Sequence, residues 1–157
     1  MSKVLPVLAF LVFAAGGCVK EKYIPYTRVI DTQENREVLK AVEAYRLAME
    51  RKDAAALLLM ASPDYFEDSG TPSADDDYGY EGLKQVLARR LMQVEQIRYS
   101  LQYMKIEVKD RIALVDVYID GSFQIHTPQG TKWDRKQEPH RMELTYDGKR
   151  WLFRRGM

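Results

Sequence analysis

The spacing of the apolar positions changes once along this chain, near residue 96, from a helical period to a strand period. In the segment 31–53, four apolar side chains recur at helical spacing: Val38, Val42, Tyr45 and Met49. This stripe predicts a helix with one buried face. Asp31 is its expected N-cap, because Glu34 follows three residues later in the order of a capping box.

Two more helices are expected before the period changes. Asp53 is a candidate N-cap for a short helix over "AAALLLMA", which the Ser62-Pro63 pair ends. A loop rich in Asp, Gly and Pro follows, in which a short strand is expected around Tyr65 and Phe66. The segment "EGLKQVLARRLMQVEQ" then predicts a third helix. Its apolar face comprises Leu83, Val86, Leu87, Leu91 and Val94.

From residue 97 onward apolar and polar residues alternate, which predicts β-strands. In "IRYSLQYMKIEV" the apolar positions change face between Tyr103 and Met104, and such a change is typical of a β-bulge. Strands are also expected over "IALVDVYIDGSFQIHT", "TKWDRKQEPHRMELTY" and "KRWLFRR". Asp147-Gly148 is a hairpin signal, and Gly121 inside its strand marks a bend.

Because the helices precede the strands, the pattern predicts an α+β fold. We expect a curved antiparallel sheet of about four long strands around a cavity, covered by the helices of the N-terminal half. The order of elements, the run "YRLAMERKDAAALLLMASPDYFED" and the closing "YDGKRWLFRR" resemble the nuclear transport factor 2-like superfamily over residues 31–155. That superfamily includes SnoaL-like cyclases, ketosteroid isomerases and many non-catalytic periplasmic modules. The resemblance implies a cone-like curved sheet wrapped on three N-terminal helices, with a pocket at the wide end of the cone. Its loose motifs specify the fold better than the activity.

The charge balance narrows the choice of partners. The chain has 157 residues, enough for one domain, and carries 24 Lys+Arg against 23 Asp+Glu without a long run of one sign. A nucleic-acid-binding protein needs a basic face, so we expect no nucleic-acid partner. The single cysteine excludes an intramolecular disulfide framework.

That cysteine, Cys18, ends the only long apolar run of the chain. Lys3 precedes the run Val4–Ala15 and two glycines follow it, which is the order found in a secretory signal peptide. The 14 uncharged residues from Val4 to Gly17 are too few for a membrane span, which needs about 20. An N-terminal anchor that stays uncleaved is the alternative.

The stretch "AAGGC" resembles the lipobox of bacterial lipoproteins, although Ala15 stands where that family most often has Leu. The resemblance implies that Cys18 receives a diacylglyceryl group, that the signal is cut before it and that the new amino terminus is acylated. Two or more acyl chains give stable membrane attachment. Val19, in place of the Asp that retains Gram-negative lipoproteins in the inner membrane, favours the outer membrane.

These signals divide the chain into three parts. Residues 1–17 are the expected lipoprotein signal peptide, residues 18–30 the lipidated cysteine and a tether, and residues 31–157 the nuclear transport factor 2-like domain. Pro25 disfavours regular structure in the tether. We expect a protein of the cell envelope that faces the periplasm.

Few side chains on the expected inward faces carry acid–base chemistry. His140 shares a face with Met142, and its imidazole lies either in the cavity or at the solvent end of the strand. Asp64 is the other weak catalytic candidate, although its place after Pro63 fits a turn residue better. The expected pocket-lining residues are Tyr65, Tyr99, Tyr103, His140 and Met142. For the tyrosines, half-buried positions in the wall account for the pattern as well as ligand contact does.

No metal and no cofactor are expected. The run Asp75-Asp76-Asp77 lacks both the ligand spacing and the glycine of a calcium loop. Asp116, Tyr118 and Asp120 face away from the expected core, as ordinary solvent-facing surface or as the contact face of a homodimer.

Two functions remain open on the sequence alone. The first is a membrane-anchored, non-catalytic module that binds a small apolar ligand or an envelope protein. The second is a SnoaL-like enzyme of the isomerase, cyclase or dehydratase type, which acts on a lipophilic small molecule by acid–base catalysis.

Overall fold

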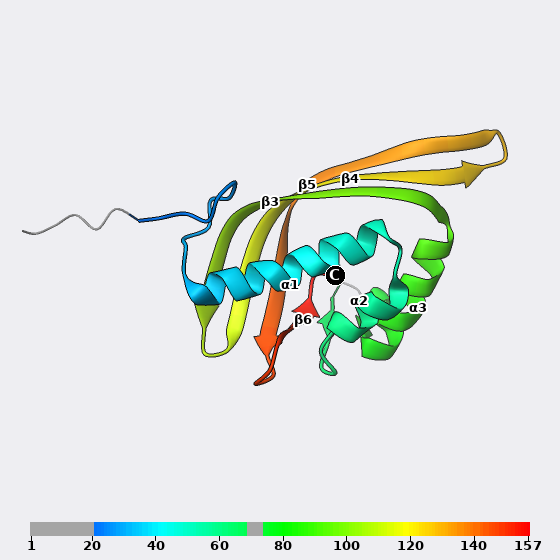
Figure 1. Ribbon diagram of the computed structural model, residues 1–157. Coiled ribbons are helices and arrows are strands. Elements are labelled where there is room, and N and C mark those ends of the chain that lie inside the picture. Colours follow the sequence, from blue (N-terminus) through cyan, green and yellow to red (C-terminus); the bar gives the residue numbers. More distant parts are fainter. Residues whose placement is uncertain (1–20, 69–73) are drawn as a thin grey trace, which may run out of the picture.

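The computed structural model describes residues 21–68 and 74–157, and helices fill most of its first half (Figure 1). Helix α1 spans Gln33–Glu50, α2 spans Ala54–Met60 and α3 spans Tyr80–Met92. The expected signal peptide, residues 1–17, and Cys18 lie outside the described residues. Their predicted cleavage and lipidation stay predictions.

The helix boundaries differ from the expected ones at two places. The N-cap of α1 is Thr32, whose hydroxyl accepts a hydrogen bond from the Asn35 backbone at 3.1 Å, and not Asp31. Asp31 instead forms an ion pair with Arg36. Helix α3 ends at Met92 because Val94 already pairs with strand β4. The Asp53 cap of α2 is confirmed, since its carboxylate accepts from the Ala56 backbone at 2.9 Å.

The second half is a four-stranded antiparallel sheet in the order β3-β4-β5-β6. Its strands are β3 (Val94–Lys109), β4 (Ile112–Thr127), β5 (Gly130–Tyr146) and β6 (Trp151–Arg155). The predicted bulge is confirmed, because the β3–β4 register shifts between Tyr103 and Lys105. Short strands β1 (Phe66–Glu67) and β2 (Tyr78–Gly79) pair with each other, and a 3-10 turn, η1, covers Ala74–Asp76.

The sheet curves around the helices, as Figure 1 shows: β3 and β4 bend past α1, and α3 leads directly into the start of β3. The far part of the β4–β5 hairpin extends beyond the helical layer. The predicted α+β cone of three helices and four long strands is confirmed in its order and its layers, although β6 is short.

The core lies between α1 and the concave face of the sheet. Alternate residues of β4, including Val115 and Val117, are buried against Val38 and Val42 of α1. Phe153 of β6 is fully buried and its ring lies 5.1 Å from that of Tyr45. Because apolar positions of strand and helix both face this layer, the sheet has one inner face that packs on the helices and one outer face in contact with solvent.

Residues 22–30 are packed onto the domain, unlike the free tether expected for this segment. Tyr23 and Ile30 form an antiparallel bridge, and the Arg28 backbone donates to the Tyr103 carbonyl at the edge of β3, at 3.0 Å. Ile24 and Val29 are buried in the core. The tether was expected because Pro25 disfavours regular structure. The apolar side chains of Ile24 and Val29 nevertheless anchor the segment, because both are buried in the core.

No helix among the described residues is both long and apolar enough to span a bilayer.

Candidate functional site

A cavity of about 350 Å³ lies between the concave face of the sheet and helices α1 and α3. Its apolar lining comes from both layers: Tyr45, Met49, Leu91, Val94, Ile97, Tyr99, Ile119, Phe123, Ile125 and Met157. Its polar lining comprises Arg90, Gln93, Asp134, Lys136, Glu138 and His140. An apolar floor with a few polar groups on one wall is the usual composition of a small-molecule pocket.

Gly121 gives the floor its shape. A Cβ at this position would lie 3.0 Å from the Phe123 ring and 3.3 Å from the Tyr99 ring. The missing side chain therefore lets both rings lie over strand β4, with their centroids 6.5 Å apart. The bend expected at this glycine thus coincides with a close approach of two aromatic side chains to the strand.

The polar wall consists of alternate residues of β5. Asp134, Lys136, Glu138 and His140 pair across the ladder with Phe123, Gly121, Ile119 and Val117 of β4, whose positions face inward. Lys136 Nζ and Glu138 Oε1 form an ion pair at 2.7 Å. The sequence analysis considered only His140 and missed the other three. Counting back in twos from His140 along the strand would have found them, because side chains on one face of a strand recur every second residue.

His140 is tied to the C-terminal segment. Its Nε2 donates to the Gly156 carbonyl at 2.9 Å, since a carbonyl oxygen can only accept. In the neutral imidazole this bond places the proton on Nε2 and leaves Nδ1 as the free basic nitrogen. Among the described residues, no carboxylate forms a hydrogen bond or ion pair with this ring.

Asp64, the other candidate acid, lies away from the cavity. Its carboxylate accepts a hydrogen bond from the Ser62 hydroxyl and faces Arg154 Nε at 3.3 Å. The Ser62 bond, together with the nearby Arg154 charge, lowers the pKa of Asp64 despite some desolvation. The structure therefore does not bring Asp64 and His140 together, and Asp64 is a turn residue held by its neighbours.

The expected pocket residues divide into two groups. Tyr99 and His140 line the cavity. Tyr65, Tyr103 and Met142 are buried but are not among its lining residues. The Tyr65 hydroxyl donates to Glu67 and accepts from the Met157 backbone, each at 3.2 Å. These three residues therefore belong to the buried core and not to the cavity lining.

Two tyrosines of the cavity keep their protons. Burial, together with the mutual influence of the two phenols, raises the pKa of Tyr45 well above its ordinary value. Burial also raises the pKa of Tyr99. Both are therefore neutral hydroxyl groups at physiological pH, able to donate or accept a hydrogen bond but not to act as bases.

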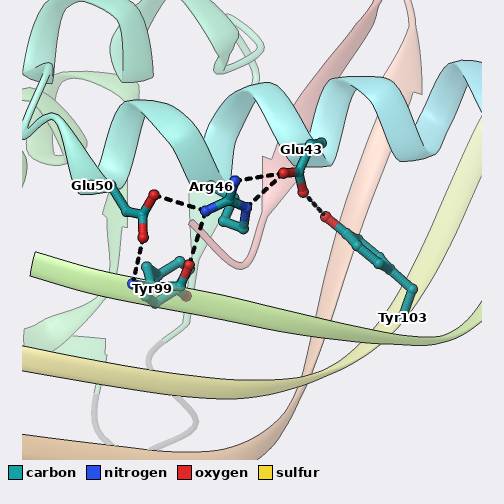
Figure 2. Close-up of polar contacts among 5 residues, drawn as sticks. All are labelled: Glu43, Arg46, Glu50, Tyr99 and Tyr103. Atoms are coloured by element: carbon teal, nitrogen blue, oxygen red, sulfur yellow. Dashed lines mark hydrogen bonds and ion pairs between the residues drawn. The ribbon is translucent and has the colours of Figure 1, made fainter. Parts of the chain in front are cut away.

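A second hollow, of about 480 Å³, lies outside the cavity, where α1 passes the free edge of β3. Figure 2 shows the side chains that close it: Arg46 donates to Glu43 at 2.7 Å, to Glu50 at 2.8 Å and to the Tyr99 carbonyl at 3.1 Å. Glu50 accepts from the Tyr99 backbone at 3.1 Å, and Glu43 accepts from the Tyr103 hydroxyl at 2.6 Å. We call Glu43, Arg46 and Glu50 the edge clamp, because Arg46 and Glu50 bind backbone groups that an edge strand leaves unpaired and Glu43 holds Arg46 and the Tyr103 hydroxyl.

The outer face of the sheet carries two bidentate ion pairs. Arg141 binds Asp116 at 2.6 and 2.9 Å, and Arg135 binds Asp120 at 2.9 and 2.7 Å. Trp133 is exposed beside them, with the Arg98 guanidinium 4.6 Å from its ring centroid. The homodimer expected through this face stays a prediction, which sedimentation of the Cys18→Ser chain at several concentrations would check.

No metal site is built from the described residues, among which no group of three or more His, Cys, Asp or Glu side chains is placed to hold an ion.

Comparison with known proteins defines the fold. No protein-family model matches the chain, and no curated protein matches it. Solved structures do. A conserved protein from Planctomyces limnophilus superposes with a TM-score of 0.67 at 13% identity, over 78% of this chain and 92% of that one. A candidate dehydratase of the NTF2-like family from Streptomyces avermitilis gives 0.63 at 18% identity, over 78% and 92%.

This chain has the nuclear transport factor 2-like fold. A third neighbour, a candidate aromatic ring hydroxylase from Novosphingobium aromaticivorans, gives a TM-score of 0.67 at 18% identity, over 80% and 88% of the two chains. The superfamily resemblance expected from the sequence is thereby confirmed at the level of the fold. Because all three sequence identities are low, these structural similarities show the fold of this chain and do not show its activity.

Proposed function

We propose that this chain is a lipid-anchored protein of the cell envelope, whose nuclear transport factor 2-like domain holds a small, largely apolar ligand without transforming it. The observation that carries the proposal is the cavity under the curved sheet. Its volume of about 350 Å³ suits a small organic molecule. The apolar floor would bury the body of such a ligand, and the β5 wall would bind its polar end.

The surroundings of His140 favour binding over catalysis. Proton transfer needs an acid and a base in reach of the same substrate atoms. The Nε2 of His140 already donates to the Gly156 carbonyl, and Glu138, two residues away, is paired with Lys136. Both groups are thus engaged in bonds that hold the wall in place, which is typical of a recognition surface.

A fluorescent probe tests the cavity. The probe 1-anilinonaphthalene-8-sulfonate has an apolar aromatic body and one anionic group, and we expect the Cys18→Ser chain to bind it with increased emission. Ile125→Trp would fill the mouth of the cavity and reduce this binding severalfold. His126→Trp is the matched control, because His126 is the next residue of β4 and its side chain is exposed on the other face. Equal binding by the two variants, or none by the parent chain, would count against the proposed site.

The anchor has a separate test. The position of Cys18 after "AAGG" supports lipidation, and Cys18→Ser should move the protein from the membrane fraction to the soluble fraction. Mass spectrometry of the mature protein should find an acylated Cys18 as the first residue. A Cys18→Ser chain that stays in the membrane fraction would instead indicate an uncleaved anchor. For the lipidated protein, density-gradient separation of the envelope would show whether it is found with the outer membrane, as we expect, or with the inner membrane.

One observation favours an enzyme as the second candidate. Glu138 and His140 line the same cavity, and two proteins of the same fold are described as candidate dehydratases, from Streptomyces avermitilis and Novosphingobium aromaticivorans. In this hypothesis Glu138 has the role for which Asp64 was the candidate on the sequence alone, and His140 Nδ1 is the base. Incubation with a metabolite extract would decide: depletion of a compound by the parent chain, but not by His140→Gln, would replace binding with turnover.

A further inference from the structure

The segment Lys22–Asp31 forms a small hairpin with two unlike faces. Ile24 donates to the Val29 carbonyl at 2.9 Å and Asp31 donates to the Lys22 carbonyl at 2.7 Å, so the two arms are paired. Ile24 and Val29 are buried in the core. The cross-strand pair Tyr23 and Ile30 lies on the other side and is 50% and 42% exposed. A rigid part of the domain thus presents apolar side chains to the surroundings.

The tip of this hairpin holds a tyrosine in an unfavourable backbone conformation. Thr27 donates to the Ile24 carbonyl at 3.1 Å across a turn whose central residues are Pro25 and Tyr26. Tyr26 has a φ of 63°, the left-handed region in which glycine is favoured. Its side chain is fully exposed, with a relative exposure of 106%, and so gains nothing from packing. A strained residue that does not stabilise the fold points to a function outside it.

The distance along the chain places this hairpin close to the predicted anchor. Lys22 is four positions after Cys18, and a fully extended chain spans about 3.5 Å per residue, so Lys22 lies within about 14 Å of the lipidated residue. The Lys22 carbonyl is fixed to the hairpin by Asp31. A lipid on Cys18 therefore brings the hairpin to the membrane surface and leaves it little freedom to move away.

We infer that the exposed face of this hairpin, with Tyr26 at its tip, docks into the interface of the bilayer and orients the domain. The inference rests on the lipid anchor of the proposed function. Tyrosine is favoured at the headgroup level, because its ring is apolar and its hydroxyl is polar. Lys20, Lys22 and Arg28 outnumber Glu21 and Asp31 in and beside the hairpin, and Asp31 is already paired with Arg36, which suits a surface of anionic lipids.

The orientation follows from the position of the hairpin in the molecule. In Figure 1 the N-terminal segment lies at one end of the sheet, and the tip of the β4–β5 hairpin lies at the other. With residues 23–30 on the bilayer, the β4–β5 tip points into the aqueous space. The cavity, which opens between α3 and the far part of β5, then faces away from the lipid.

Site-directed labelling tests this docking. A cysteine at position 26 or at position 129 is the only free thiol once the lipid occupies the Cys18 sulfur. We would attach an environment-sensitive nitrobenzoxadiazole label to each lipidated variant on vesicles of phosphatidylethanolamine and phosphatidylglycerol. The Tyr26→Cys label should show blue-shifted emission and a severalfold slower reduction by dithionite. The Gln129→Cys label, at the exposed β4–β5 turn, should behave as in water.

A tryptophan variant provides a second test of the same position, which needs no label, in case a labelled chain fails to fold. Tyr26→Trp retains an aromatic ring, and its emission should shift to the blue when the lipidated protein is bound to the same vesicles. The parent chain is the control, because its two tryptophans, the exposed Trp133 on the far hairpin and Trp151 at the start of β6, should keep their emission.

The outcomes separate the two proposals. An unmodified Cys18 in mass spectrometry would overturn the anchor. An acylated, vesicle-bound protein whose position 26 is as accessible as position 129 would overturn the docking alone. Protection of position 26 in native envelopes but not in protein-free vesicles would also overturn it, and would assign the hairpin to a protein partner.

Discussion

At the scale of single residues, Gly156 is a position where both the backbone conformation and the surrounding atoms exclude a side chain. Its φ is +83°, and a Cβ there would lie 2.6 Å from the Arg141 carbonyl and 3.2 Å from His140 Nε2. The Gly156 backbone also donates to Glu67 at 2.9 Å. The C-terminal end of β6 is thus held against β5 by contacts that only a residue without a side chain permits.

We expect Gly156→Ala to lower the free energy of unfolding by about 3 kcal/mol, from backbone strain and from the close contact with β5. Gly130→Ala is the matched control, because Gly130 also has a positive φ, of 119°, but nothing lies within 4 Å of its added Cβ. It should lower the same free energy by about 1 kcal/mol, from strain alone. Denaturant titration of both variants measures the difference, and equal losses would contradict the close-contact argument.

The residue scale also governs the acid dependence of stability. Partial burial raises the pKa of Glu43, but hydrogen bonds from Arg46 and Tyr103 outweigh it, so the net pKa is below the ordinary 4.5. A pKa lowered by folding stabilises the native state above the pKa of the unfolded chain. This stabilisation is lost as the pH falls through the lower, native pKa.

Glu43→Gln should therefore show a smaller loss of unfolding free energy between neutral and acid pH than the parent chain. Tyr103→Phe should change the profile in the same direction, because it removes one of the bonds that favour the carboxylate. Denaturant titrations across the acid range measure this. A Glu43→Gln profile parallel to that of the parent would show that the clamp carboxylate does not contribute.

At the scale of elements, the edge clamp joins α1 to β3. Strand β3 has a partner on one side only, and α1 supplies the hydrogen bonds that a further strand would make at Tyr99. The docked hairpin makes the corresponding bond at Tyr103 through Arg28. Helix and hairpin together cover the free edge, which protects it from pairing with another chain.

Arg46→Ala should lower the free energy of unfolding by about 2 kcal/mol, because it leaves the Tyr99 carbonyl without its side-chain donor and removes one of the donors to Glu43 and to Glu50. Arg36→Ala, on the same helix, is the control: Arg36 also pairs with a carboxylate, that of Asp31, but is exposed and does not reach the sheet. Its removal should change stability little. Thermal unfolding of both variants compares them, and similar losses would mean that the β3 edge contact is not what matters.

At the scale of the whole molecule, the domain begins earlier than its helices. The expected boundary at residue 31 follows the start of helical periodicity, but Val29 is 1% exposed and lies in the core. Residues 22–30 are therefore part of the folded unit, which leaves only a few residues between the domain and Cys18. The short connection is why an anchored form of this protein has a restricted orientation.

Val29→Ala should lower the free energy of unfolding by about 2 kcal/mol, because it opens space in the core. Ile30→Ala, at the neighbouring exposed position, should change it by about 0.5 kcal/mol or less. Chemical denaturation measures both free energies. If residues 22–30 were a free tether, both variants would have the free energy of unfolding of the parent chain.

The sequence by itself determined the order and type of the elements, since helical and strand periods depend only on which side chains must be buried. It located the bulge after Tyr103, the Asp53 cap and the Asp147-Gly148 turn between β5 and β6, and so predicted the fold. It also located Tyr99 and His140, because inward alternation along one strand is a local property. Local spacing could not show which buried residues meet across strands.

Only the tertiary structure decided which of these side chains share a site. It separated Asp64 from His140, because the turn after α2 packs against β6 while the cavity opens toward α3. It placed Asp134, Lys136 and Glu138 in the cavity lining, while Asp134 and Lys136 stay exposed to solvent as their charge predicts. It also docked residues 22–30 on the edge of β3. These outcomes depend on contacts between residues far apart in the chain, and such contacts form only when the whole sheet has curved around its helices.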